Sequence, residues 1–599
     1  MYRMNIENTL QLEISKAIEE IYGVLPNPNL VQIQKTKREF EGNFTLVVFP
    51  LLKVSKKKPE DTAQEIGERL VATSQIITSF NVVKGFLNLT LSTDFWCGVL
   101  NTISNTTDFG YAKSGSSGKT KMVEFSSPNT NKPLHLGHIR NNLLGFSVSR
   151  ILEANGHRVI KVNLVNDRGI HICKSMLAWQ RFGNGETPVS SGKKGDHLVG
   201  DYYVLFDKEY KKQIAELQDK GMSEEEAKVK APIIIEAQEM LRKWEAKDSE
   251  IYSLWQTMNQ WVYAGFDVTY SALGIEFDKV YYESETYILG KSIVNEGLAK
   301  GVFAKKTDGS VWVDLKDDGL DEKLLLRSDG TSVYMTQDIG TAIQRFNEYR
   351  LDDHIYVVGN EQEYHFNVLK LVMAKLGYEW AEHLYHLSYG MVQLPEGKMK
   401  SREGTVVDAD ELIDEMISTA QEMSEELGKL NELSAEEASK IVETIGLGAL
   451  KYFILKVDPK KSMTFNPKES IDFNGNTGPF VQYTHARIQS ILRKASEVGI
   501  AIPQSIEPFN LGDKERELVQ LVSALPGIIK QAGEMLSPAL LANFAYDLSK
   551  EYNQFYHEFS ILKEEDEKVR QARLLISHEV ANAIRISMGL LGIDVPNRM

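Results

Sequence analysis

The sequence predicts a multidomain α/β protein, in which a parallel-sheet domain with insertions lies between a small α+β domain and an all-helical bundle. Three observations predict this organisation. An apolar strand, an amphipathic helix and a second apolar strand follow one another across residues 123–165, which is the spacing of a βαβ crossover. Residues 1–115 mix helical and strand patterns, and from about residue 475 apolar residues recur at helical spacing alone.

Length and composition fit a cytoplasmic protein. The 599 residues are enough for several domains, each with its own core. No run of about 18 apolar residues and no apolar signal segment occur, so we expect neither a membrane span nor secretion. Cys97 and Cys173 offer no disulfide framework and no cysteine-based zinc site. The net charge of −15 argues against a polyanionic partner, although short basic runs, usually solvated faces, leave a local basic surface open.

Residues 1–115 are expected to form the small α+β domain. Residues 44–49 have the pattern of a strand, and Pro59 occupies an allowed first-turn position of a helix. Residues 81–91 are predicted as one strand broken by a glycine. No catalytic constellation occurs here, so a purely structural role is an alternative. The Gly- and Ser-rich residues 111–121 are typical of a linker.

The parallel-sheet domain is predicted to begin with strand 123–125, a polar loop and a helix. The helix has one apolar face, formed by Ile139, Leu143, Leu144, Val148, Ile151 and Leu152. Gly156 stands where a left-handed residue would end this helix. The second strand of the crossover, 159–165, follows at once, and the order of elements favours a Rossmann-like sheet.

Two histidines mark the point where the loop enters the helix. His135 and His138 are three residues apart, so both imidazoles would project from one side of the first turn. Backbone N–H groups there favour anions, and Gly137 would let a flat ring approach the backbone. This pattern predicts a nucleotide site. A zinc-binding pair or two surface histidines are the alternatives, and no further ligand at the right spacing supports a metal.

Polar residues also follow later apolar segments. Asp167 and Gly169 come directly after the second strand, and Gln362 comes after the apolar residues 354–359. Polar residues at the carboxyl ends of parallel strands line the crevice where ligands bind in such sheets. Residues 190–260 are charged and helical, and we interpret them as an insertion.

Tyr334 and Asp338 are four residues apart and would share one face of a helix. A buried carboxylate needs a cation, and a guanidinium matches it at two points. Pairing with an arginine of the protein, or capping of a helix, is the alternative for Asp338.

A glycine-flanked cationic loop, residues 398–402, precedes a helix that Asp408 opens with a capping pattern. Such a loop can close on a pyrophosphate leaving group. A solvent-facing loop without a function is the alternative.

These stretches resemble known signatures. His135-Leu-Gly-His138 resembles the His-Ile-Gly-His motif of class I aminoacyl-tRNA synthetases, and residues 126–141 resemble the arginyl-tRNA synthetases. Residues 398–402 resemble the Lys-Met-Ser-Lys-Ser loop of the class. Ser401 stands where a second lysine is usual, and Lys132 or Lys400 is the expected replacement.

The resemblance implies roles for individual residues. It implies catalysis by Lys132, His135, His138 and Lys398, and ATP binding by these residues together with Gly137, Met399, Lys400 and Ser401. It implies arginine binding by Glu124, Ser127, Asn129, His138, Tyr334, Asp338 and Gln362. For the helical bundle it implies tRNA contacts, for which Tyr483, Arg487, Arg598 and Met599 are the candidates because aromatic and arginine groups stack on splayed bases. Core packing is the alternative for most of the bundle's aromatic residues.

The resemblance also implies the domains and the reaction. Residues 1–115 would contact the corner of the tRNA, 116–474 would form the catalytic domain, and 475–599 would bind the anticodon. The enzyme would attach L-arginine to the terminal adenosine of tRNA(Arg) through an arginyl-adenylate, using ATP with Mg²⁺. No structural metal is expected, and the chain is expected to be a monomer. Adenylate formation is expected to need bound tRNA. A cysteinyl enzyme would need a Cys/His zinc site, and a non-catalytic RNA-binding paralogue should lack the histidine pair or Lys398.

Overall fold

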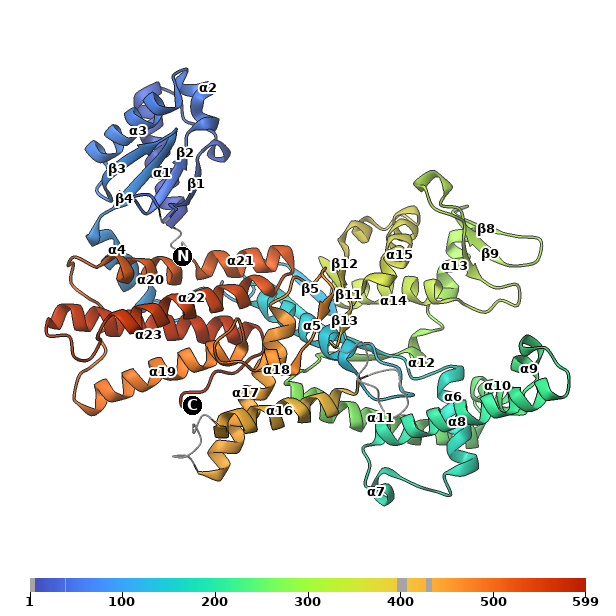
Figure 1. Cartoon of the computed structure of the whole chain (residues 1–599). Coiled ribbons are helices and arrows are strands. Elements are labelled where there is room, and N and C mark those ends of the chain that lie inside the picture. Colours follow the sequence, from blue (N-terminus) through green and yellow to red (C-terminus); the bar gives the residue numbers. More distant parts are fainter. Residues whose placement is uncertain (1–5, 38, 396–406, 427–433) are drawn as a thin grey trace.

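A five-stranded parallel sheet forms the centre of the molecule. The computed structural model describes residues 6–37, 39–395, 407–426 and 434–599. Within these, the central strands lie in the order β12-β11-β5-β6-β7, and all neighbours are parallel (Figure 1). Their bounds are β5 (Thr120–Glu124), β6 (Arg158–Val165), β7 (Lys279–Tyr282), β11 (Asp353–Gly359) and β12 (Leu384–Tyr389). This confirms the predicted Rossmann-like sheet.

Helix α5 (Leu136–Ala154) makes the predicted crossover from β5 to β6. It is buried along most of its length because it lies between the sheet and the helical bundle. The helix packs closely on the end of the central strand: a Cβ on Gly145 would meet the Phe125 ring at 2.2 Å. On its other side, Ser147 Oγ donates a hydrogen bond to the Leu590 carbonyl at 3.1 Å. Gly156 follows the helix with φ +82°, as its position predicted.

Two insertions interrupt the sheet and lie together on one side of the molecule (Figure 1). The first, between β6 and β7, consists of α6 (Ile170–Phe182), α7 (Pro188–Ser191), α8 (Gly195–Asp219), α9 (Glu224–Lys230), α10 (Pro232–Glu245) and α11 (Ser249–Leu273). The second, between β7 and β11, consists of α12 (Glu283–Thr286), α13 (Gly290–Ala299), an antiparallel sheet of β8 (Phe303–Lys305), β9 (Val311–Val313) and β10 (Lys323–Leu326), and α14 (Tyr334–Tyr349). A 3-10 turn, η4 (Asn360–Gln362), and α15 (Glu363–Lys375) connect β11 to β12.

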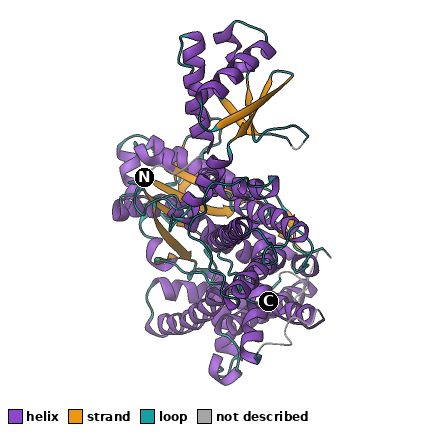
Figure 2. Ribbon diagram, turned by 90° about the vertical axis from the view of Figure 1, so that its left-hand side faces the viewer, coloured by secondary structure: helices purple, strands orange, loops and turns teal. Residues whose placement is uncertain are grey.

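The N-terminal part is a four-stranded antiparallel sheet covered by helices, and Figure 2 shows it at one end of the molecule. Its elements are α1 (Ile6–Tyr22), β1 (Gln32–Lys35), β2 (Phe44–Val47), α2 (Leu52–Ser55), α3 (Pro59–Thr73), β3 (Ile77–Val83) and β4 (Phe86–Leu91). The prediction of one strand over residues 81–91 is wrong. Lys84 and Gly85 have φ of +49° and +79°, and this two-residue turn makes β3 and β4 a hairpin.

The C-terminal part is helical from residue 478 on, as predicted from about residue 475, and further helices precede that region. It contains α16 (Ala409–Glu426), α17 (Ala435–Leu455), α18 (Pro467–Ser470), α19 (Gly478–Glu497), α20 (Asp513–Ser523), α21 (Leu525–Met535), α22 (Ala539–Glu558) and α23 (Glu567–Leu590). Helix α4 (Thr93–Ser104) fastens the N-terminal part to this bundle, because the Asn101 amide exchanges two hydrogen bonds with the Ile506 backbone at 2.9 and 2.8 Å. A short parallel pair, β13 (Val392–Gln393) with β14 (Met463–Thr464), lies beside α5. Among the described residues, no helix has the length and apolar character needed to cross a membrane.

Candidate active site

The two histidines form a compact pair at the start of α5. His135 is the N-cap residue, and its Nδ1 accepts a hydrogen bond from the Gly137 backbone N–H at 3.1 Å. The Nδ1 of His138 accepts from the His135 backbone N–H at 3.2 Å. The ring centroids are 3.9 Å apart. The pair therefore satisfies two N–H groups that a helix start leaves without a partner, as a capping box does.

These bonds fix which ring nitrogen carries the proton. Burial, with Lys132 nearby, lowers the pKa of His135 to about 4. Burial and the neighbouring His135 lower the pKa of His138 well below its ordinary value. Both rings are therefore neutral at pH 7. Because each Nδ1 accepts a hydrogen bond, each Nε2 must carry the hydrogen and can donate it to a ligand.

The loop between β5 and α5 is held in an uncommon conformation. Ser126 and Ser127 have φ of +73° and +46°, a region that costs energy for residues other than glycine. Side chains brace it: Asn141 Oδ1 accepts from the Ser126 N–H at 2.5 Å, and Asn163 Oδ1 accepts from the Ser127 N–H at 3.1 Å. Ser127 and Asn129 remain exposed at the carboxyl edge of the sheet.

An acidic corner lies at the start of α14. Tyr334 is the first residue of the helix and is 71% exposed. The Asp338 carboxylate, one turn later, lies 2.6 Å from His365 Nε2. Among the described residues it has no bond to an arginine. Its face toward solvent is therefore free for a cation, which the alternative of an internal arginine partner would have prevented.

Glu283, which was not among the residues predicted from the sequence, lies directly after β7 and opens α12. Its side chain is buried, and α12 packs against α14. Burial raises the pKa of Glu283 to about 7; Arg168 opposes this rise, whereas Asp338 and Asp167 add to it. Glu283 and Asp338 therefore form one acidic corner. The signal was present, because Glu283 is a polar residue at the carboxyl end of a parallel strand, like Asp167 and Gln362.

Glu124, expected to bind arginine, has a different partner. Its buried carboxylate forms an ion pair with Arg345 of α14 and lies 3.9 Å from His354 Nε2. Burial raises the Glu124 pKa, while Arg345 lowers it. The structure therefore pairs Glu124 with an internal guanidinium, and its part in arginine binding stays a prediction.

Asp167 braces the site from within. Its carboxylate accepts from the Ser284 N–H and Oγ–H at 2.9 and 2.7 Å and from the Tyr263 hydroxyl at 3.0 Å. It thereby joins β6 to α11 and to the segment that carries Glu283. Gln362 ends the turn η4 and is exposed at the same edge of the sheet.

Lys398, Met399, Lys400 and Ser401 lie outside the described residues. The chain on either side is fastened to α5. After the gap, the Leu136 N–H donates to the Val407 carbonyl and the Ala409 N–H to the Leu134 carbonyl, both at 3.0 Å. Before the gap, the buried Arg140 guanidinium donates to the Met391 carbonyl at 3.1 Å. Residues on both sides of the predicted loop are therefore bound to the histidine helix or its entry.

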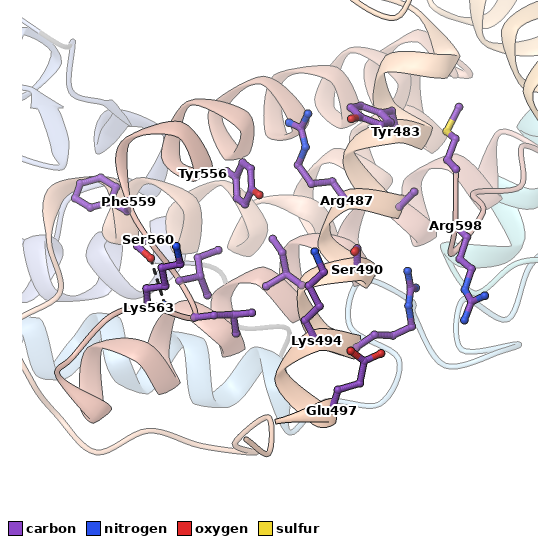
Figure 3. A pocket seen from close by; sticks show the side chains of 16 residues that line it. Tyr483, Arg487, Ser490, Lys494, Glu497, Tyr556, Phe559, Ser560, Lys563 and Arg598 are labelled. Atoms are coloured by element: carbon purple, nitrogen blue, oxygen red, sulfur yellow. Dashed lines mark hydrogen bonds between the residues drawn. The ribbon is translucent and has the colours of Figure 1, made fainter. Parts of the chain in front are cut away.

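The helical bundle contains a second candidate site, an open pocket of about 1140 Å³ (Figure 3). Tyr483, Arg487, Arg598 and Met599 all line it. The Arg487 guanidinium lies 4.7 Å from the Tyr483 ring centroid and 5.3 Å from that of Tyr556. The other charged residues lining the pocket are Arg493, Lys494, Lys563 and Glu497. Positive charge beside aromatic rings suits unstacked bases of a nucleic acid.

Comparisons with known proteins agree with this geometry. The catalytic domain of class I (R) tRNA synthetases matches residues 100–466, the DALR anticodon-binding domain 481–599, and the arginyl-tRNA synthetase N-terminal domain 8–91. An arginine–tRNA ligase of Bacteroides thetaiotaomicron is 62% identical and one of Flavobacterium psychrophilum 56% identical, each with 100% of both chains covered. Thermus thermophilus arginyl-tRNA synthetase has the same fold, with a TM-score of 0.77 at 24% identity and 100% of both chains covered. The chain belongs to the arginyl-tRNA synthetase family of class I enzymes.

Proposed function

We propose that the chain attaches L-arginine to the 3′-terminal adenosine of tRNA(Arg) through an arginyl-adenylate, releasing AMP and pyrophosphate. The observation that supports this proposal is that the loop leading to the neutral histidine pair follows the carboxyl end of β5, while Glu283 of the acidic corner follows the carboxyl end of β7 in the same parallel sheet. The full-length similarity to arginine–tRNA ligases supports the same reaction.

The histidine pair is proposed to act on the α-phosphate of ATP. The arginine carboxylate attacks the α-phosphorus, and negative charge develops on the phosphate oxygens. The Nε2–H groups of His135 and His138 are donors that can stabilise this charge, and burial strengthens their effect. Lys132, whose pKa is lowered by burial, would contact the leaving phosphates with Lys398 and Lys400. Gly137, Met399 and Ser401 would complete the ATP site. Mg²⁺ is proposed to enter with the ATP phosphates.

The acidic corner is proposed to hold the guanidinium of the substrate. Asp338 and Glu283 approach from two elements and offer acceptors that a planar fork can satisfy, and Tyr334 lies one turn before Asp338 on α14. The exposed Ser127, Asn129 and Gln362 would hold the amino acid's other end. Lysine as a substrate would leave some of these acceptors without a hydrogen-bond donor. The unpaired acceptors should favour arginine over lysine by a factor on the order of 10⁴–10⁵.

The bundle pocket is proposed to receive anticodon bases, with Tyr483 and Arg487 as a stacking surface and Arg598 and Met599 as contacts. We propose the division 1–115, 116–474 and 475–599 for the tRNA-corner, catalytic and anticodon-binding domains. A monomeric state and a cytoplasmic location are part of the same proposal.

Aminoacylation of a tRNA(Arg) transcript tests this function. Labelled arginine should become acid-precipitable only with ATP present, and neither lysine nor citrulline, the neutral isostere of arginine, should replace it. Equal charging with citrulline would contradict a site built for a charged fork, and no charging with arginine would contradict the function itself.

A further inference from the structure

A half-buried polar cluster outside the substrate site joins the first insertion to the segment that follows the predicted loop. Lys194 is the N-cap residue of α8, and its Nζ donates to Thr269 Oγ1 of α11 at 2.7 Å. The same ammonium forms ion pairs with Asp410 of α16 and, at 3.2 Å, with Asp196.

Further bonds converge on Asp410. Thr269 Oγ1 donates to its Oδ1 at 2.8 Å, and His197 Nε2 lies 2.9 Å from its Oδ2. His197 Nε2 is also 3.7 Å from the carboxylate of Asp408, the residue that caps α16. One carboxylate thus receives bonds from three side chains of the insertion.

The cluster has the donor types of a metal site, since ligand atoms of Asp196, His197 and Asp410 lie within 4.8 Å of one another. The Lys194 ammonium, however, already supplies the cation that these carboxylates need, and a metal would have to displace it. A fixed cation of the chain indicates a structural connection and not an ion-binding site.

The segment that this cluster holds is the one that contacts the histidine motif. Val407 and Ala409 exchange backbone hydrogen bonds with Leu136 and Leu134 on either side of His135, and His135 pairs with Asp408 as an isolated bridge. A displacement of Asp410 would therefore be passed to the residue that caps α5.

The same helix also supports the other side of the histidine motif. A Cβ on Gly200 of α8 would stand 2.9 Å from Pro133 Cδ and 3.6 Å from Lys132 Cα. The helix is itself pressed against α11, because a Cβ on Gly195 would stand 2.1 Å from the Trp261 carbonyl oxygen. Helix α8 thus approaches the chain just before His135 directly and also holds Asp408 and Asp410 of the segment that pairs with His135.

We propose that Lys194 and His197 are positioning residues for the phosphate site: through Asp408 and Asp410 they fix residues 407–409 against residues 134–136 and so set the placement of His135 and Lys132. Neither residue needs to touch substrate. The inference rests on the proposed function, because the group being positioned is the donor pair for the α-phosphate.

The test compares two neighbouring lysines. Lys194→Met removes the half-buried ammonium, whereas Lys193→Met removes an exposed one that, within the described part of the chain, forms an ion pair with Asp201 at 2.6 Å. The rate is measured as arginine-dependent exchange of pyrophosphate into ATP, with tRNA present. We expect Lys194→Met to lower kcat roughly tenfold to a hundredfold, the range for a small misplacement of a catalytic group. The KM for arginine should stay within about twofold, because the acidic corner stands on other elements. Lys193→Met should match wild type, and Lys194→Arg should recover part of the rate.

Equal kcat in Lys194→Met and Lys193→Met would overturn the inference, as would an equal loss in kcat and in arginine binding, which would indicate general damage to the fold. If Lys194→Met does not fold, His197→Gln, which keeps the lysine, serves instead and must also lower kcat. A second readout does not need activity: the ¹⁵N resonances of His135 should shift in Lys194→Met and not in Lys193→Met. Unchanged resonances overturn the inference, whereas absence of exchange in the wild type would count against the proposed function alone.

Discussion

Glu283 should make arginine binding depend on pH in the physiological range. The carboxyl group is buried, and its pKa is raised to about 7, so near neutrality it is only partly ionised in the free protein. A guanidinium binds the ionised form more tightly than the neutral one. The apparent affinity for arginine should therefore increase as pH rises through 7.

The size of the effect follows from the ionised fraction. With a pKa of about 7, this fraction is about one tenth at pH 6 and about nine tenths at pH 8. If arginine binds only the ionised form, the apparent affinity rises by the ratio of these fractions, roughly tenfold. Glu283→Gln removes the titration, so its weaker affinity should be nearly constant over the same range.

Equilibrium binding of arginine, measured by calorimetry at pH 6, 7 and 8 with buffers of different ionisation heats, provides the assay. Wild type should release close to one proton per arginine bound at pH 6 and almost none at pH 8. Glu283→Asp, which keeps a titrating group, is the matched control. An identical pH dependence in wild type and Glu283→Gln would refute the assignment of Glu283 to the substrate corner.

Three further variants follow from the same structure. Arg345→Met leaves the Glu124 carboxylate buried without its cation, so urea unfolding should show a loss of about 3–5 kcal/mol; the double variant with Glu124→Gln should regain most of it, and no recovery would contradict the pairing. Arg487→Ala should weaken tRNA binding about tenfold, the worth of roughly one stacked base, without changing arginine affinity; filter binding measures the first, and an unchanged tRNA affinity would argue against the pocket. The pKa of His135 is lowered to about 4 in the folded protein, so as pH falls the unfolded chain is protonated at this residue before the folded protein is. The free energy of unfolding should therefore decrease as pH drops from about 6.5 toward 4. His135→Gln should flatten that part of the stability curve, and an unchanged slope would contradict the depressed pKa.

The elements that the sequence predicted well are those with local periodicity. Apolar residues recur at helical spacing along α5 from Ile139 to Leu152, which is about four turns, and Gly156 marks its end, so the crossover to β6 followed from pattern alone. The hairpin at Lys84 and Gly85 was missed because a lysine is an uncommon residue in the left-handed region. The pattern there contained a single glycine, which is equally typical of a bulge.

The parts of the site that were not predicted depend on contacts distant in sequence. The partner of Glu124 is Arg345, 221 residues away, and the sequence around Glu124 does not predict this pairing. Glu283 follows a strand of only four residues, too short for an alternating pattern to stand out. The cluster around Lys194 joins residues separated by more than 200 positions, and its charged members, taken alone, resemble ordinary surface charges.

Asp338 tests the central claim most directly. The measurement is arginine-dependent exchange of pyrophosphate into ATP in the presence of tRNA, for wild type and Asp338→Ala, alongside the tRNA affinity of each. If Asp338 binds the guanidinium of arginine, the variant should lose the exchange activity and keep its affinity for tRNA. Retained arginine activation by Asp338→Ala would contradict that chemistry.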